Sequence, residues 1–202
     1  MNKFSVVGIG PGHPDYLLPI SLQAIENAEL LIGGRRHLDL FSRLNKKELE
    51  LKGNYDEVFS YIKENCPVQK IAVLVSGDPG YHSLLGRISI IFEQSEYTVF
   101  PGLSSFQLAM ARIGKTWNDV ELISLHGKNL EDTLNSQKGK MVLLTDFKNT
   151  PKAIADYLLS RGFQGRNVFI AENLSYSNER IIQLKMEEIK EEEYKLCLMI
   201  IE

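Results

Sequence analysis

The chain has 202 residues, of which 44% are hydrophobic and 24% are charged, and its formal net charge is −3. This balance is ordinary for a globular protein of one large domain or two small ones, and it lacks the overall positive charge typical of nucleic-acid-binding proteins. No apolar run approaches the roughly 20 residues that a membrane span needs. We therefore expect a cytoplasmic protein with small-molecule partners, and neither a nucleic-acid nor a membrane partner.

Cysteine and histidine are too scattered to suggest a metal site. Cys66 and Cys197 lie far apart and outside any Cys-x-x-Cys pair, which favours reduced structural thiols. The 4 histidines lack the i, i+4 spacing of a helical metal-binding pair. The amino terminus leads directly into an apolar strand pattern rather than a signal peptide. We expect no protein-bound metal.

The first half of the sequence alternates short apolar runs with amphipathic stretches, the pattern of a parallel sheet with helices on its faces. Pro19 suits the first turn of a helix, Ser104 and Gln107 form a capping-box pattern at the start of another, and Gly114 suits that helix's end. The predicted strands are 4–7, 30–32, 71–75 and 97–100. The predicted helices are one starting at Pro19 and those at 56–65, 84–92 and 104–114.

A polar connector at 115–119 separates two predicted domains, after which the alternation of strands and helices restarts. We place an N-terminal α/β domain at 1–114 and a C-terminal α/β domain at 115–202. Thr150 and Pro151 suit a helix start, and Gly162 its end. The short connections after residue 171 favour antiparallel pairing, so the second sheet should be mixed. The predicted strands here are 120–125, 141–144, 167–171, 181–182 and 196–201.

Three glycine-rich loops follow predicted strands and are the strongest functional signal in the chain. They read Gly-Ile-Gly-Pro-Gly at 8–12, Gly-Asp-Pro-Gly at 77–80 and Pro-Gly-Leu-Ser-Ser at 101–105. Open α/β sheets bind ligands at the carboxyl ends of their strands. We therefore expect the three loops to line one shared cleft.

Nucleotide-binding patterns fit the first loop poorly. A dinucleotide-binding loop requires Gly-x-Gly-x-x-Gly, but His13 occupies the last position, and Arg35 and Arg36 stand where NAD-binding folds place an acid. NADP, which favours arginine there, is a weaker mismatch. The phosphate loop Gly-x-x-x-x-Gly-Lys-Ser/Thr is missing. A non-catalytic nucleotide-binding module is the alternative from another functional class, and the two arginines are equally well explained as a solvated rim.

The order and spacing of the three loops resemble the tetrapyrrole methylase family, which transfers methyl groups from S-adenosylmethionine. Four longer stretches, 33–38, 76–86, 124–127 and 172–174, are similar to a branch that methylates C5 of a corrin-ring precursor in cobalamin biosynthesis. Some relatives carry a second, decarboxylating module, and we expect a single methylation here. Methylation of another ring position is the nearest alternative. The acidic balance disfavours the branch that methylates ribosomal RNA.

The resemblance implies two α/β domains with a cofactor cleft between them, mainly parallel in the N-terminal sheet, and a homodimer. The substrate would be a polycarboxylate tetrapyrrole, which calls for a positive rim and arginine forks. No catalytic base is assigned; Tyr81, His82 and His126 are acid-base candidates only. The implied cofactor contacts are Pro11, Gly77, Asp78, Gly80, Tyr81, Ser104, Ser105, His126 and Leu174. The candidate substrate contacts are Gly10, Gly12, Arg35, Arg36 and Arg112.

Overall fold

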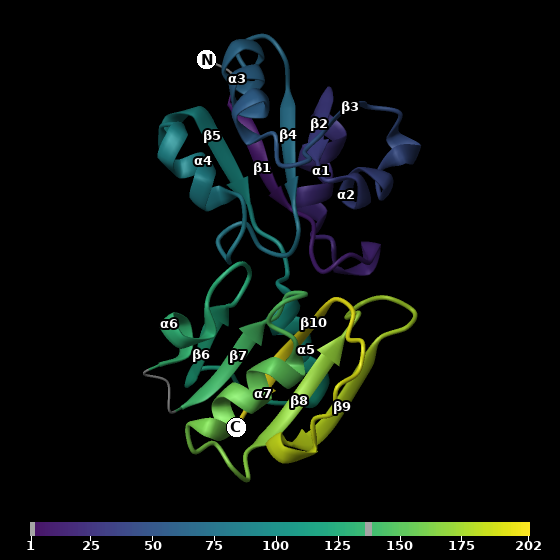
Figure 1. Cartoon of the computed structure of the whole chain (residues 1–202). Helices are drawn as coiled ribbons and strands as arrows, with labels where there is room; N and C mark the ends of the chain where they lie inside the picture. Colours follow the sequence, from purple (N-terminus) through teal and green to yellow (C-terminus); the bar gives the residue numbers. More distant parts are fainter. Residues whose placement is uncertain (1–2, 136–138) are drawn as a thin grey trace. The chain divides into compact units, whose positions relative to one another are not determined.

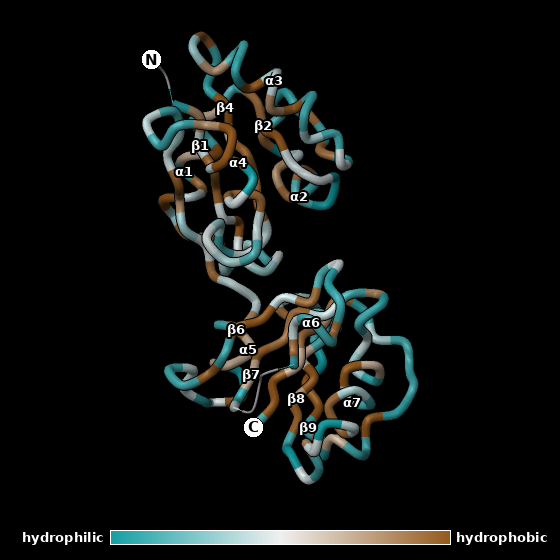
Figure 2. The backbone as a smooth tube through the Cα atoms, turned by 60° about the vertical axis from the view of Figure 1, so that its left-hand side comes forward, coloured by the Kyte–Doolittle hydropathy of each residue, from teal (hydrophilic) through white to brown (hydrophobic). Residues whose placement is uncertain are grey.

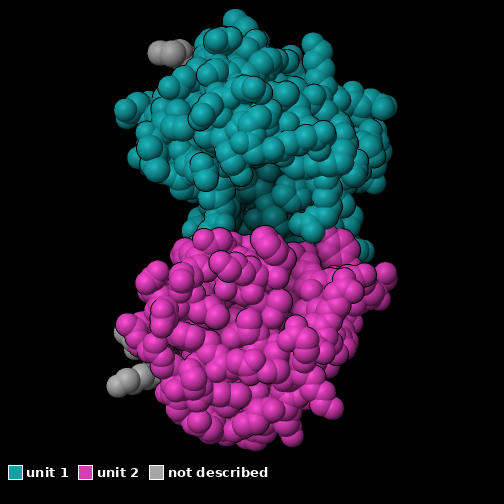
Figure 3. Space-filling view, in the orientation of Figure 1, with its two compact units in different colours: residues 1–105 teal, residues 106–202 magenta. Residues whose placement is uncertain are grey.

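The structure is a computed structural model, which describes residues 3–135 and 139–202 (Figure 1). The chain forms two compact units, residues 1–105 and residues 106–202 (Figure 3). Helix α5 (Ser105–Ile113) therefore lies in the second unit except for its first residue, whereas the boundary expected after Gly114 places it with the first. None of the helices in residues 3–135 and 139–202 has the length and apolar character of a membrane span.

The first unit contains a parallel sheet of five strands in the order β3-β2-β4-β1-β5. The parallel sheet and four of its strands are confirmed, but β3 was not predicted. It is an edge strand of three charged residues and one leucine, without an apolar pattern that would reveal a strand, and it is identified by its pairing with β2. The strands are β1 (Phe4–Gly8), β2 (Leu30–Gly33), β3 (Lys47–Glu50), β4 (Ile71–Val75) and β5 (Tyr97–Phe100).

Helices cover both faces of this sheet, which explains why its middle strand, β4, is apolar along its whole length. Strands β2 and β4 appear as brown, hydrophobic segments in Figure 2. Val7 belongs to the core beneath α1 (Pro19–Asn27) and α2 (Arg35–Asp39). Its neighbour Val6 belongs to the core beneath α3 (Tyr55–Asn65) and α4 (Leu85–Ile91). Short 3₁₀ helices lie at Pro14–Tyr16, Ser42–Leu44 and Gln94–Glu96.

The second unit contains a mixed sheet, as the sequence predicts. Its strands lie in the order β6-β7-β10-β8-β9. Strands β6 and β7 are parallel, β10 is antiparallel to both β7 and β8, and β9 is antiparallel to β8. The strands are β6 (Val120–Ser124), β7 (Lys140–Leu144), β8 (Asn167–Glu172), β9 (Arg180–Lys185) and β10 (Cys197–Ile201).

Helix α7 (Pro151–Ser160) packs on this sheet through Ile154 and Leu158, which are fully buried. Its start follows the predicted chemistry, because the Thr150 side chain accepts a hydrogen bond from the Ala153 amide at 3.2 Å. The other helices of the unit are α5, α6 (Leu130–Leu134) and the 3₁₀ helix Met186–Glu188.

Candidate functional site

The candidate site lies where the chain leaves β1 and β4, two neighbouring parallel strands at the middle of the first sheet. From β1 the chain continues to α1 on one face, whereas from β4 it continues to α4 on the opposite face. This divergence is a topological switch point, the place where open α/β sheets bind ligands at the carboxyl ends of their strands.

The loops after β1 and β4 are joined beyond the ends of their strands. The Gly77 amide donates to the Gly10 carbonyl at 2.8 Å, and the Gly10 amide donates to the Gly77 carbonyl at 3.3 Å. Both glycines have positive φ, +73° at Gly10 and +65° at Gly77, a conformation that costs other residues free energy. The predicted proximity of these two loops is therefore confirmed by a reciprocal backbone pair.

The Asp78 carboxylate joins the loop after β5 to the same cluster. Its Oδ2 accepts a hydrogen bond from the Gly102 amide at 3.1 Å, and its Oδ1 accepts one from the Gly80 amide at 2.8 Å. A single half-buried side chain thus fixes the turn at 77–80 and ties it to a third strand end. All three glycine-rich loops meet at one end of the sheet.

Gly8 and Gly102 allow the backbones of these loops to approach closely. A Cβ on Gly102 would lie 2.1 Å from the Gly77 carbonyl oxygen, and a Cβ on Gly8 would lie 2.7 Å from that same atom. No side chain fits at either position without moving the backbone. Gly8 and Gly102 were not predicted as site residues, although each stands in one of the glycine-rich loops, just after the end of a predicted strand.

The remaining candidates of the first unit border this cluster with differing exposure. Pro11 and Gly12 are buried, Ser104 is 2% exposed, and Ser105 begins α5. Burial raises the pKa of Tyr81 to about 12, so its hydroxyl stays protonated at neutral pH and cannot act as a base there.

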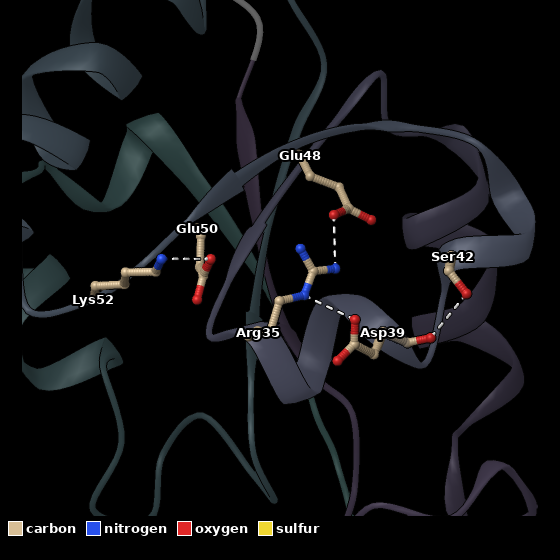
Figure 4. Close-up of polar contacts among 6 residues, drawn as sticks. All are labelled: Arg35, Asp39, Ser42, Glu48, Glu50 and Lys52. Atoms are coloured by element: carbon tan, nitrogen blue, oxygen red, sulfur yellow. Dashed lines mark hydrogen bonds and ion pairs between the residues drawn. The ribbon is translucent and has the colours of Figure 1, made fainter.

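Of the two arginines after β2, Arg35 is held by carboxylates of the protein itself (Figure 4). The Arg35 guanidinium binds Glu48 and Asp39, each at 2.8 Å, and these hydrogen bonds raise its pKa. Arg36 is exposed and makes no ion pair within residues 3–135 and 139–202. Of the two arginines, Arg36 is therefore the one available to bind an acidic group of a ligand.

The second unit holds the other candidates, which are His126, Leu174 and Arg112. His126, after β6, is exposed, and its Nδ1 lies 3.2 Å from the Ser124 hydroxyl. Leu174, after β8, is 5% exposed. Strands β6 and β8 run in the same direction, so His126 and Leu174 follow them at the same end of the sheet. The two strands are three strand spacings apart, about 14 Å. Arg112 also belongs to this unit, where it pairs with Glu179 at 2.7 Å.

Metal ligands do not cluster at this site. Across the described ranges, no three His, Cys, Asp or Glu side chains gather as a metal ion would require. The groups that do converge are backbone amides and carbonyls, one carboxylate, and small side chains. This set suits a polar organic ligand held against open backbone.

Comparison with known proteins gives matches along nearly the whole chain. A family model described as Tetrapyrrole (Corrin/Porphyrin) Methylases matches residues 3–190. The chain is 35% identical over 192 residues to a probable cobalt-precorrin-7 C(5)-methyltransferase of Methanocaldococcus jannaschii, covering 91% of this chain and 90% of that protein. It is 33% identical over 177 residues to the cobalt-precorrin-7 C(5)-methyltransferase of Salmonella typhimurium, covering 88% of each.

The solved structures agree with the sequence matches. The crystal structure of the cobalamin biosynthesis precorrin-6Y methylase from Archaeoglobus fulgidus superposes with a TM-score of 0.75 at 25% identity. The superposition covers 99% of this chain and 97% of that one. With its two α/β sheets, its three joined strand-end loops and these matches, the chain belongs to the tetrapyrrole methylase family.

Proposed function

We propose that the protein transfers a methyl group from S-adenosylmethionine to C5 of cobalt-precorrin-7, giving cobalt-precorrin-8, in cobalamin biosynthesis. The observation that carries this proposal is the joining of three glycine-rich loops at the switch point of the first sheet. The two curated relatives described above carry this activity in their names and match along most of their length.

The strand-end loops fit a nucleoside methyl donor. The two Asp78 hydrogen bonds to backbone amides use part of the acceptor capacity of a carboxylate, so lone pairs remain for hydroxyl or ammonium groups of a ligand. S-adenosylmethionine supplies a methyl group that its sulfonium already activates. We assign it the contacts Pro11, Gly77, Asp78, Gly80, Tyr81, Ser104 and Ser105 from the first unit, and His126 and Leu174 from the second.

The chain's own contribution is positioning rather than proton transfer. Holding two reactants in line supplies as much as about 7–11 kcal/mol of barrier reduction in well-oriented systems. The fixed loops at Gly10, Gly77 and Gly102 provide a rigid frame for that purpose. The electron-rich macrocycle supplies the nucleophilic carbon, so no strong base is required before transfer. Tyr81, protonated at neutral pH, acts in this scheme as a hydrogen-bond donor.

The arginines and the loop after β1 bind the acetate and propionate groups of the substrate in this proposal. Arg36 carries the largest share, because Arg35 and Arg112 are already paired with carboxylates. The backbone at Gly10 and Gly12 completes the proposed substrate contacts. We further propose that the protein is cytoplasmic, and that it acts as a homodimer, as the family resemblance implies.

The proposal is tested by mapping the product. The purified protein is incubated with cobalt-precorrin-7 and S-adenosylmethionine carrying a ¹³C-labelled methyl group, and the product is examined by NMR. The expected result is one labelled methyl group, attached at C5. A label at another ring position would assign the protein to a different methylation step of the same family, and an unlabelled macrocycle would contradict the proposal.

A further inference from the structure

Phe147 is the most exposed large hydrophobic residue among those described, at 96%. It lies in the loop that follows β7, in the second unit. Burial of a phenylalanine side chain stabilises a protein, and Phe147 makes no such contribution. The Phe147 ring is therefore accessible to a ligand.

The loop around Phe147 is held by hydrogen bonds on both sides of it. The Asp146 Oδ1 accepts from the Lys148 amide at 2.9 Å and from the Asn149 amide at 2.6 Å. Asn149 is 4% exposed, so its side chain anchors the loop to the interior. Phe147 is thus presented on a fixed turn.

A second loop, which follows β6, is bound to the first. The Gly127 amide donates to Asp146 Oδ2 at 2.8 Å, and Asn149 Nδ2 donates to the carbonyls of Leu125 at 2.7 Å and Lys128 at 3.1 Å. Burial raises the pKa of Asp146, but its bonds to three backbone amides outweigh burial and lower it overall. The hydrogen bonds of Asp146 and Asn149, here called the clamp, thus join the two loops. The Asp146 carboxylate stays charged at neutral pH.

The two clamped loops also present unmatched positive charge. Lys128 and Lys148 are exposed, and neither ammonium makes an ion pair with any residue in the ranges 3–135 and 139–202. By contrast, Lys115, Lys140 and Lys152 of the same unit are paired with Glu202, Asp119 and Asp156. Phe147 and the two lysines thus lie on two loops that hydrogen bonds hold together.

We propose that Phe147, Lys128 and Lys148, here called the loop platform, bind the tetrapyrrole substrate. Phe147 packs against the conjugated face of the macrocycle, and the two lysines attract its acetate and propionate groups. An aromatic ring matches a conjugated ring system, and lysine acts as a point charge toward carboxylates. This inference rests on the proposed function, because it takes its ligand class from the proposed substrate.

The test uses uroporphyrin, a stable polycarboxylate tetrapyrrole, titrated against the whole protein by fluorescence. Phe147→Ala should weaken porphyrin binding about tenfold, and Phe147→Trp should restore it. Lys128→Gln and Lys148→Gln should each weaken it about two- to threefold at low salt, with the effect vanishing at high salt. Ile90→Ala, at a residue 84% exposed in the first unit, and Lys190→Gln are matched controls and should change nothing.

Each protein is also titrated with S-adenosylhomocysteine by calorimetry, which separates the platform from the proposed function. All platform variants should bind this ligand as the wild-type protein does. Equal porphyrin affinity in the wild-type and Phe147→Ala proteins, or no porphyrin binding by a wild-type protein that binds S-adenosylhomocysteine, overturns the platform and leaves the cofactor assignment standing. A folded wild-type protein that binds neither ligand overturns the proposed function and the platform together.

Discussion

The Asp78 Oδ2 atom accepts a hydrogen bond from the Gly102 amide at 3.1 Å, across 24 residues of sequence. Its Oδ1 atom accepts from Gly80, two residues along the same turn, at 2.8 Å. One carboxylate thus determines both the shape of the loop after β4 and its attachment to the loop after β5. The geometry of the candidate site therefore depends on the two acceptor oxygens of Asp78, which substitutions can remove one at a time.

Replacing Asp78 should lower stability and cofactor affinity in two steps. Asn retains one acceptor oxygen and Ala retains none, so the free energy of unfolding should fall by about 1 kcal/mol in Asp78→Asn and by about twice that in Asp78→Ala. Denaturant unfolding and calorimetric titration with S-adenosylhomocysteine measure the two effects. Asp156→Asn, which removes an exposed pair with Lys152, should leave that affinity unchanged. Undiminished affinity in Asp78→Ala would show that the loop tie is dispensable.

Two glycines should respond to alanine in opposite directions. A Cβ at Gly102 would meet the Gly77 carbonyl oxygen at 2.1 Å, whereas a Cβ at Gly86, within α4, would meet nothing within 4 Å. Gly102→Ala should therefore lower the Tm and abolish S-adenosylhomocysteine binding. Gly86→Ala should stabilise the protein by about 0.5–1 kcal/mol, because alanine favours the helix. Thermal melts of both variants check the prediction, and a tolerated Gly102→Ala would contradict the close backbone approach.

His37 should make the stability depend on pH. Burial and then the charge of Arg36 lower the pKa of His37, against a backbone hydrogen bond to Leu74 that raises it. The folded protein therefore binds this proton more weakly than the unfolded chain does, so stability falls as the pH drops below about 6.5, the ordinary histidine value. His37→Gln should show a smaller decrease in Tm between about pH 7.5 and about pH 5.5. Equal decreases in the two proteins would remove His37 as the cause.

Arg36 and Arg35 should contribute unequally to tetrapyrrole binding. Arg36→Gln should weaken uroporphyrin binding about threefold at low salt, because an exposed charge contributes modestly. Arg35→Gln should have a smaller effect, since Asp39 and Glu48 already neutralise that guanidinium. S-adenosylhomocysteine affinity should stay constant in both variants. If a variant that carries both Arg35→Gln and Arg36→Gln binds uroporphyrin as tightly as the wild-type protein does, these arginines do not contact the substrate.

The sequence was most informative where local chemistry and burial act together. Residues 71–75 and 97–100 are strands at their predicted bounds, and Pro19 and Thr150 stand at the helix starts where they were expected. The three glycine-rich loops were placed correctly because tight backbone approach at a strand end has few residue solutions. Their meeting at one end of the sheet follows from parallel strand order.

The parts that escaped prediction depend on tertiary partners. Strand β3 and helix α2 are short, and neither carries a long apolar pattern of its own. Because both were missed, the acids that bind Arg35, Asp39 on α2 and Glu48 on β3, were missed with them. The loop platform was also missed, since the clamp formed by Asp146 and Asn149 brings together loops that lie about 20 residues apart, with no pattern in the residues between.

The most direct test of the central claim is calorimetric titration of the wild-type protein with S-adenosylhomocysteine, with NADPH as the competing ligand class. The methyltransferase assignment predicts binding of S-adenosylhomocysteine at one site per chain and no binding of NADPH. Binding of NADPH, or no binding of S-adenosylhomocysteine by a protein shown to be folded, would contradict the methyltransferase assignment and favour a nucleotide-binding module without this activity.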